Sequence, residues 1–246
     1  MINCLTAIAT PGAFGHRYDL DRIKTLLQAQ IENSLELGWE QKSIKVLTNF
    51  DYEFMDIKCQ QIESNPLCPT ASKMYGVRQV LKEDVVWSHD LDAWQNAWFE
   101  CPQFKDIGAG TYNYRKFNGG SIFWRFSAID LMDEIIDTLE SESATYEENV
   151  LNRVFKANPD RVTQLNFTYN VGCSNYRERW KDSEKPVKVL HFHPYNRIAW
   201  ETQALDRCKM GKKGISDRLE NLLRKYYDLA TELKEKNNGI NTNGLV

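Results

Sequence analysis

The first fifty residues place a long segment of helical periodicity between two short apolar runs. Residues 4–10 form the first apolar run, which ends at a Pro-Gly pair and so predicts a buried strand that enters a loop. Apolar positions then recur at helical spacing as far as Gly38, and Asp19 or Asp21 can cap this helix. Residues 44–49 predict a second strand. The order strand, helix, strand favours a parallel sheet with right-handed crossovers.

The rest of the chain continues this alternation. Predicted helices cover residues 71–81, 127–139, 145–157 and 216–236, and predicted strands cover residues 85–87, 121–124, 161–165 and 187–192. Thr145 and Glu148 have capping-box spacing. The aromatic and glycine-rich segment 94–117 is predicted to be irregular. We therefore expect an α/β fold with a Rossmann-like, mostly parallel sheet flanked by helices, in one domain.

The expected division of the chain follows from the tail. Residues 1–212 form the predicted domain, and residues 213–238 form an amphipathic C-terminal helix that packs on it or on a second copy in a possible homodimer. Residues 239–246 are rich in Asn and Gly and are predicted to be a flexible tail.

Composition limits the partners and the compartment. A net charge of -3 and a sequence pI near 5.9 give no basic surface for nucleic acid or anionic membranes. The N-terminus lacks a signal-peptide pattern, and no run reaches about 18 apolar residues. Six cysteines occur without a CxxC pair, which favours reduced thiols. We expect a soluble, unexported, cytoplasmic protein without a membrane span.

Two Asp-x-Asp triplets are the first candidates for chemistry. Asp19-Leu20-Asp21 precedes a predicted helix, so we assign it to capping. Asp90-Leu91-Asp92 follows a hydrophobic strand, where carboxylates are costly to desolvate without a compensating positive charge. Oxygen ligands suit Mg²⁺ or Mn²⁺, and such a cation can bridge to a diphosphate. Position alone equally allows an acidic loop that faces water.

Residues 85–92, Val-Val-Trp-Ser-His-Asp-Leu-Asp, resemble the strand and DxD element of GT-A glycosyltransferases, in particular the glycogenin-like and bacterial galactosyltransferase-like group, family eight. A later segment of that family reads H-F-x-G-x-x-K-P-W, and residues 191–200 here read His-Phe-His-Pro-Tyr-Asn-Arg-Ile-Ala-Trp. The resemblance implies that His191 is the third metal ligand and that Arg197 contacts phosphate. Pro194 replaces the family's glycine, and the Trp stands one residue late. Without the DxD, a structural histidine at a strand end would be the favoured interpretation of His191.

Two looser similarities concern the donor sugar. Asn118-Gly119-Gly120 is similar to the family's N-A-G-V segment, which contacts the donor, and small residues allow the backbone to approach a ligand. An ordinary glycine turn is the alternative. Glu147 falls on the family's sugar-contacting acid and Glu148 on the following Gln, although Glu148 can instead serve the capping box.

The nucleotide is expected across the first strands, because ligands of open α/β sheets lie outside the carboxyl ends of the strands. Ala9 and Thr10 end the first predicted strand, and Thr48 and Asn49 end the second. Lys73 and Arg78 match the family's basic residue in order, and a basic group there would offset phosphate charge. A solvated helix face is the alternative for either one.

The resemblance thus implies a hexosyltransferase that uses Mn²⁺ or Mg²⁺. It would move a sugar from a nucleotide-sugar donor, UDP-glucose or UDP-galactose for example, to a carbohydrate or other hydroxyl acceptor, with retention of configuration. Asp92 and Glu147 are the candidate catalytic residues. Aromatic residues between Trp94 and Tyr114 are candidates for stacking on the acceptor.

Other functions compete with this interpretation. A dehalogenase-type phosphatase fits poorly, because its D-x-D lies near the start of the chain and continues Gly-Thr. A nucleotidyltransferase, whose glycine-rich signature is missing after the first strand, and a non-catalytic nucleotide-sugar-binding protein remain the alternatives.

Overall fold

The computed structural model describes residues 1–9, 20–63, 69–82, 85–111, 116–142, 147–172, 176–192 and 214–226. Its helices correspond closely to the segments of helical periodicity. The α-helices are α1 (Leu20–Glu36), α2 (Pro69–Val80), α3 (Ile129–Ser141), α4 (Glu147–Ala157) and α5 (Tyr176–Asp182), and the 3-10 turns are η2 (Gln41–Ser43), η3 (Phe126–Ala128) and η4 (Phe167–Tyr169). Asp21 lies in the first turn of α1, where a carboxylate favours the positive end of the helix dipole.

Three sheets are present in this part of the chain. The seven-stranded sheet has the order β10-β8-β9-β6-β1-β2-β5, β12 lies between β11 and β7 in a three-stranded sheet, and β3 pairs with β4. The strands are β1 (Ile2–Ala7), β2 (Ile44–Thr48), β3 (Glu53–Phe54), β4 (Ile57–Lys58), β5 (Gln60–Gln61), β6 (Val86–His89), β7 (Ala93–Gln95), β8 (Ile107–Thr111), β9 (Phe117–Trp124), β10 (Val162–Gln164), β11 (Val171–Gly172) and β12 (Val189–His191).

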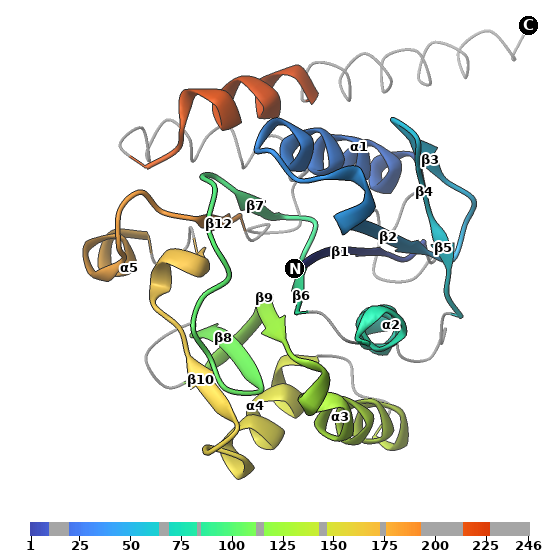
Figure 1. Ribbon diagram of the computed structural model, residues 1–246, viewed down its shortest axis with the longest axis vertical. Coiled ribbons are helices and arrows are strands. Elements are labelled where there is room, and N and C mark those ends of the chain that lie inside the picture. Colours follow the sequence, from blue (N-terminus) through green and yellow to red (C-terminus); the bar gives the residue numbers. More distant parts are fainter. Residues whose placement is uncertain are drawn as a thin grey trace, which may run out of the picture.

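The large sheet is mostly parallel. Strands β6, β1, β2 and β5 pair in parallel, as do β10 and β8, whereas β9 runs antiparallel to both β6 and β8. Figure 1 shows α1 on one side of the sheet and α2, α3 and α4 on the other. The expected α/β fold, a mostly parallel sheet flanked by helices, is confirmed.

Alternating side chains fill the two interfaces between sheet and helices. Cys4 and Trp124 belong to the hydrophobic cluster that includes α2, α3 and α4, whereas their neighbours Leu5 and Phe123 belong to the cluster that includes α1. Successive side chains of a strand point to opposite faces. Each strand of the centre therefore contributes to both halves of the core, and burial of this apolar surface drives folding.

The prediction that residues 94–117 are irregular was wrong in part: β8 lies within this segment, β7 extends into it from Ala93, and β9 begins at Phe117. Ile107–Thr111 forms β8, although Gly108 and Gly110 weaken the strand signal of its sequence. Close packing explains the glycines, because a Cβ at Gly108 would lie 2.9 Å from the Phe104 ring and a Cβ at Gly110 would lie 2.8 Å from the Cβ of Asn170.

Residues 217–226 form a helix beside α1. Its apolar positions Leu219, Leu222, Leu223 and Tyr226 are buried, and they cluster with Leu26 and Ala29 of α1. Positions 227–236 of the predicted helix, and the predicted tail, lie outside the described residues. The division of the chain at residue 212 stays a prediction. No helix in the described ranges is long and apolar enough to cross a membrane.

Candidate metal and donor site

The Asp90-Leu91-Asp92 triplet forms a turn directly after β6. The backbone amide of Ala93 donates to the carbonyl oxygen of Asp90 at 2.9 Å, and the amide of Asp90 donates to the carbonyl oxygen of Gly120 at 3.1 Å. The turn then leads into β7. The two carboxylates are thereby presented at the carboxyl end of a central strand, which is where ligands bind in open α/β sheets.

The side chain of Gln30 holds this turn from the α1 side. Its Nε2 donates to the carbonyl oxygens of Leu91 at 2.9 Å and of Ala93 at 3.1 Å. Gln30 is fully buried, so these bonds form where unpaired carbonyl groups would be costly. These hydrogen bonds therefore fix the backbone of the turn that carries the two carboxylates.

His89 holds the same turn from within β6. Its Nδ1 lies 3.0 Å from the carbonyl oxygen of Ala93 and 3.2 Å from that of Asp90, and its Nε2 lies 3.0 Å from the side-chain amide of Asn3. The ring stacks on Trp87 with centroids 4.0 Å apart. Burial lowers the pKa of His89 to about 4. His89 thus acts as part of the support of the turn.

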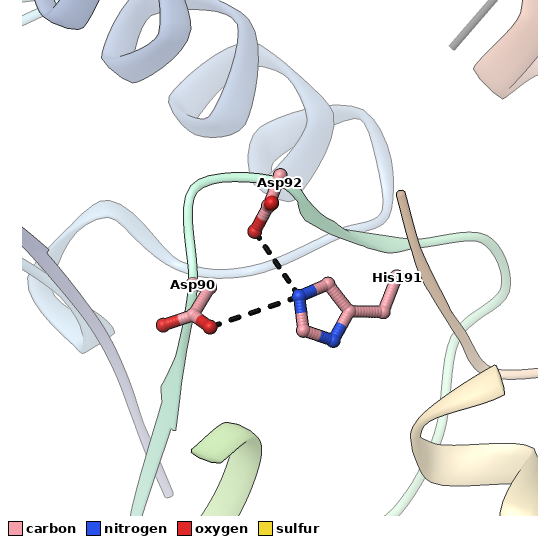
Figure 2. A group of neighbouring side chains, drawn as sticks. All are labelled: Asp90, Asp92 and His191. Atoms are coloured by element: carbon pink, nitrogen blue, oxygen red, sulfur yellow. Dashed lines mark hydrogen bonds and ion pairs between the residues drawn. The ribbon is translucent and has the colours of Figure 1, made fainter. Parts of the chain in front are cut away.

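His191 reaches the turn from β12, in the smaller sheet. Its Nε2 lies 3.2 Å from an oxygen of Asp92 and 3.7 Å from an oxygen of Asp90 (Figure 2). Burial lowers the pKa of His191, but the two carboxylates outweigh burial and raise it above its usual value. Nε2 of His191 and one carboxylate oxygen each of Asp90 and Asp92 therefore face the same space.

Asp90, Asp92 and His191 together form a group that can hold a metal ion. One ligand atom from each residue lies within 4.8 Å of the others. Two carboxylates and one imidazole suit Mg²⁺ or Mn²⁺ better than a soft metal, since oxygen ligands predominate. The buried imidazole and the partly exposed acids leave the carboxylate side open to a ligand.

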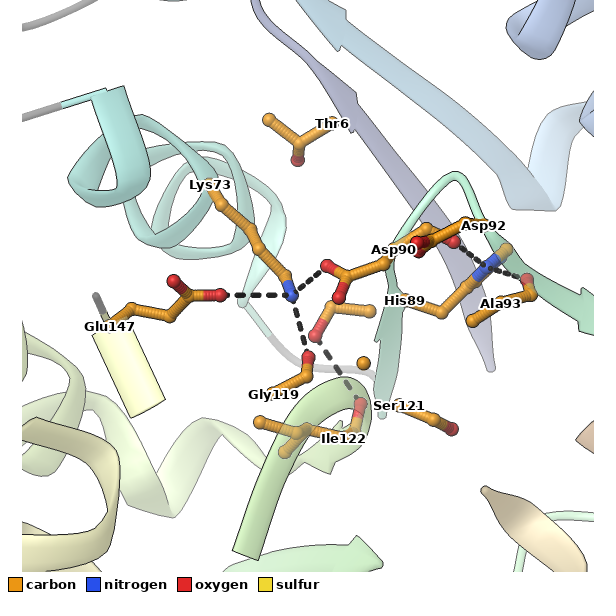
Figure 3. A network of polar contacts seen from close by, with 12 residues as sticks. Thr6, Lys73, His89, Asp90, Asp92, Ala93, Gly119, Ser121, Ile122 and Glu147 are labelled. Carbon is orange, nitrogen blue, oxygen red and sulfur yellow. Dashed lines mark hydrogen bonds and ion pairs between the residues drawn. The ribbon is translucent and has the colours of Figure 1, made fainter. Parts of the chain in front are cut away.

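Lys73 of α2 lies on the other side of Asp90. Its Nζ is ion-paired with Asp90, donates to the carbonyl oxygen of Gly119 at 2.6 Å and lies 4.0 Å from Oε1 of Glu147 (Figure 3). Burial lowers the pKa of Lys73, but Asp90 and Glu147 raise it above its usual value. The ammonium group therefore stays charged among the candidate ligands.

Glu147 is the first residue of α4 and faces Lys73. Burial raises the pKa of this carboxyl group, and Lys73 opposes the shift. A Cβ at Gly119 would lie 3.2 Å from Oε1 of Glu147. The absence of a side chain at Gly119 thus allows the β9 backbone and this acid to approach each other closely.

Gly120 fits closely against His191. A Cβ at this position would lie 2.1 Å from Cε1 and 2.3 Å from Nδ1 of the imidazole. Asn118, two residues earlier in β9, accepts a hydrogen bond from the amide of Gly120 at 2.9 Å. The Asn-Gly-Gly segment is therefore packed against the candidate metal ligand His191 and is not an isolated turn.

The remaining predicted residues are placed differently. Asn49 and Ala9 pair with each other, because the side-chain amide exchanges two hydrogen bonds of 2.8 Å with the backbone of Ala9. Thr48 donates to the carbonyl oxygen of Phe50 at 2.6 Å. Arg78 lies apart from the acids of the site and is paired with Asp133 of α3 at 2.6 Å. Thr10 and Arg197 lie outside the described residues.

Several side chains of the site carry no sequence signal. Gln30 lies within an ordinary amphipathic helix, and Asn170 follows η4 without any motif. The aromatic residues that were predicted to stack on the acceptor differ in their exposure. Trp94 is fully buried and cannot stack on a sugar, Trp98 is 42% exposed, and residues 112–115 lie outside the described ranges.

Neither the comparison with protein-family models nor that with curated proteins found a match. The similarity lies in three dimensions, and the fold is that of the GT-A glycosyltransferases. One similar structure is the galactosyltransferase LgtC in complex with donor and acceptor sugar analogues, with a TM-score of 0.58 and 15% identity over 92% of this chain and 96% of that chain.

Two further solved structures share the fold. The glycosyltransferase GlyE of Streptococcus pneumoniae TIGR4 has a TM-score of 0.56 and 12% identity, over 93% of this chain and 64% of that one. A glycosyltransferase involved in glycosylation of the major capsid of PBCV-1 has a TM-score of 0.50 and 14% identity, over 83% of this chain and 98% of that one.

Proposed function

We propose that the chain is a glycosyltransferase of family eight. It would move a hexose-type sugar from a nucleotide diphosphate sugar, UDP-glucose or UDP-galactose, to a hydroxyl group of a carbohydrate or other acceptor, with retention of configuration. The observation that carries the proposal is the group Asp90, Asp92 and His191, whose ligand atoms lie within 4.8 Å of one another at the carboxyl end of β6 in a GT-A fold.

In this proposal Asp90, Asp92 and His191 would hold Mn²⁺ or Mg²⁺, which when bound would supply positive charge for the diphosphate leaving group. Lys73 offers a second positive charge, because its neighbours keep the ammonium protonated. Preorganised positive groups of this kind stabilise the charge that develops as the bond to the sugar breaks.

Glu147 would orient the donor sugar by accepting hydrogen bonds from its hydroxyl groups. Its Oε1 lies 4.0 Å from Nζ of Lys73, which also contacts Asp90 and the carbonyl oxygen of Gly119, so the acid belongs to the same polar group as the candidate metal ligands. Asp92 would be a ligand of the cation, and through the cation it would help to stabilise the leaving group. The acceptor hydroxyl would attack the anomeric carbon from the face that the diphosphate leaves, and its proton would pass to the departing phosphate oxygen as the bond to the sugar breaks.

The first experiment measures binding and slow hydrolysis of a panel of nucleotide sugars, with Mn²⁺ and with excess EDTA. We expect UDP-glucose or UDP-galactose to bind with Mn²⁺ present, and free sugar and UDP to be released slowly without an acceptor. Chelation should abolish release.

A matched pair of variants locates the activity. Asp92→Asn should abolish Mn²⁺-dependent release, whereas Asp137→Asn, at an exposed aspartate of α3, should leave it unchanged. Tight binding without any release would instead indicate a binding protein, and full release in EDTA would remove the cation from the mechanism.

A further inference from the structure

A line of side-chain amides connects a carboxylate of α4 to the imidazole of His191. Asn118 of β9 and Asn170, which follows η4, are 2% and 1% exposed, and His191 is 1% exposed. Glu148 of α4 lies at the outer end of the line, with 30% of its side chain exposed. Buried polar groups of this kind must be paired, and their pairing leaves one consistent arrangement of donors and acceptors.

The orientation of Asn118 is determined by its two outer contacts. Its Nδ2 donates to the carboxylate of Glu148, and its Oδ1 accepts from the backbone amide of Gly120 at 2.9 Å. A carboxylate can only accept, and a backbone N–H can only donate. A reversed Asn118 would place an oxygen against the carboxylate and an NH₂ group against an N–H, so this amide cannot be turned.

The orientation of Asn170 follows from that of Asn118. Its Nδ2 donates to Oδ1 of Asn118 at 2.7 Å, which leaves its own Oδ1 facing Nδ1 of His191 at 3.2 Å. The Oδ1 of Asn118 lies at 3.2 Å from the same nitrogen. Because both oxygens only accept, Nδ1 of His191 must be a donor and carry a proton. The Nε2 atom is then the one available to a metal, and it faces Asp92 and Asp90.

We propose that Glu148 and Asn170 are positioning residues of the candidate metal site, and that the relay from Glu148 through Asn118 and Asn170 keeps Nδ1 of His191 protonated and Nε2 aimed at Asp90 and Asp92. This inference rests on the proposed function for the identity of the ligand at Nε2. Ligating histidines commonly donate their other N–H to such a partner, which fixes both the tautomer and the ring orientation.

Two glycines make room for the relay. A Cβ at Gly120 would lie 2.1 Å from the imidazole of His191 and 2.8 Å from Oδ1 of Asn118, and a Cβ at Gly110 would lie 2.8 Å from the Cβ of Asn170. Any side chain at either position would push a member of the relay away. The glycines of β8 and β9 therefore allow the backbone to lie close against these side chains, which is what a positioning role requires.

The test follows Nδ1 directly by NMR of the full chain labelled with ¹⁵N-histidine, without added metal. The wild type should show an Nδ1–H signal in slow exchange with water, assigned by its loss in His191→Gln. Asn170→Leu and Glu148→Leu should each speed up this exchange. Mn²⁺ titration should then show an affinity lowered about tenfold or more in both variants. Glu148→Gln should keep both properties, because its amide oxygen can still accept from Asn118.

The control is Asn158→Ala, at an asparagine whose side chain donates to the carbonyl oxygen of Val154 within α4. Melting temperatures of all variants test folding, and the Glu148 pair keeps the test decisive if Asn170→Leu does not fold, since Glu148 is partly exposed. Unchanged exchange and unchanged Mn²⁺ affinity in Glu148→Leu would overturn the relay, as would an equal loss in Glu148→Gln. A wild type that binds no Mn²⁺ overturns the proposed function, and the exchange measurement still decides the relay.

Discussion

The backbone amide of Phe192 donates to the carbonyl oxygen of Asp92 at 2.9 Å. This bond continues the antiparallel pairing of β12 with β7, in which His191 stands opposite Ala93. The strand that carries the imidazole is thus joined by its backbone to the turn that carries the carboxylates. The distance of 3.2 Å between His191 and Asp92 follows from strand pairing as well as from side-chain attraction.

His191→Ala and Asp92→Asn should each weaken Mn²⁺ binding and donor binding together. The double variant should lose little more than either single one, because residues that serve one metal act as a unit. Titration calorimetry with Mn²⁺ and then with UDP-sugar measures both affinities. A histidine with a purely structural role would instead lower the melting temperature and leave the metal requirement unchanged.

Gln30→Leu should loosen the turn that carries both acids. The substitution leaves the carbonyl groups of Leu91 and Ala93 without their side-chain donor, which costs about 1–3 kcal/mol for a buried group. Urea unfolding should show this loss, and Mn²⁺ affinity should fall with it. Gln61→Leu, at an exposed glutamine, is the control and should change neither quantity.

Gly120→Ala should reduce Mn²⁺ binding strongly, because the added methyl group would collide with the ring of His191. The control is Gly172→Ala in β11, where the added Cβ would lie 3.2 Å from Nη1 of Arg179, a much looser fit than the 2.1 Å at Gly120. Calorimetric titration of both variants with Mn²⁺ checks the difference. Equal affinity for the two would show that the contact of Gly120 with the imidazole has no role in binding.

The acid stability of the chain should depend on Arg161. This guanidinium group bonds both oxygens of Asp130 and lowers the pKa of that carboxyl group from 3.8 to about 2. A lowered pKa stabilises the folded state above the unfolded value and loses this contribution as pH falls through the folded value. Unfolding midpoints between pH 5 and pH 2 should therefore fall less steeply in Asp130→Asn than in the wild type.

Leu219→Ala should destabilise the fold without affecting the site. Leu219 is fully buried between the helix of residues 217–226 and α1, and such a truncation costs about 2–5 kcal/mol. Arg224→Ala removes an exposed pair with Glu220, which contributes less than about 1 kcal/mol. Melting curves should separate the two, while Mn²⁺ affinity stays at the wild-type level in both.

The sequence predicted the elements with strong periodicity and the acids that follow a buried strand. The pattern of residues 85–92 placed Asp90 and Asp92 correctly at the end of β6. The strand β8 escaped prediction because its glycines serve packing against Phe104 and Asn170, and packing has no periodicity along the chain. The side chains of Gln30 and Asn170 are found only by geometry, since each acts on residues at least 21 positions away.

Asp92 and His191 are 99 positions apart in the sequence. During synthesis from the N-terminus, Asp90 and Asp92 are therefore made long before the strand that completes their group. A nascent chain that ends before β12 has the acids without their imidazole and without the backbone bond to Phe192. If the group holds a cation as proposed, chains truncated before β12 (Val189–His191) should not bind it, and binding should require β12 to dock beside β7.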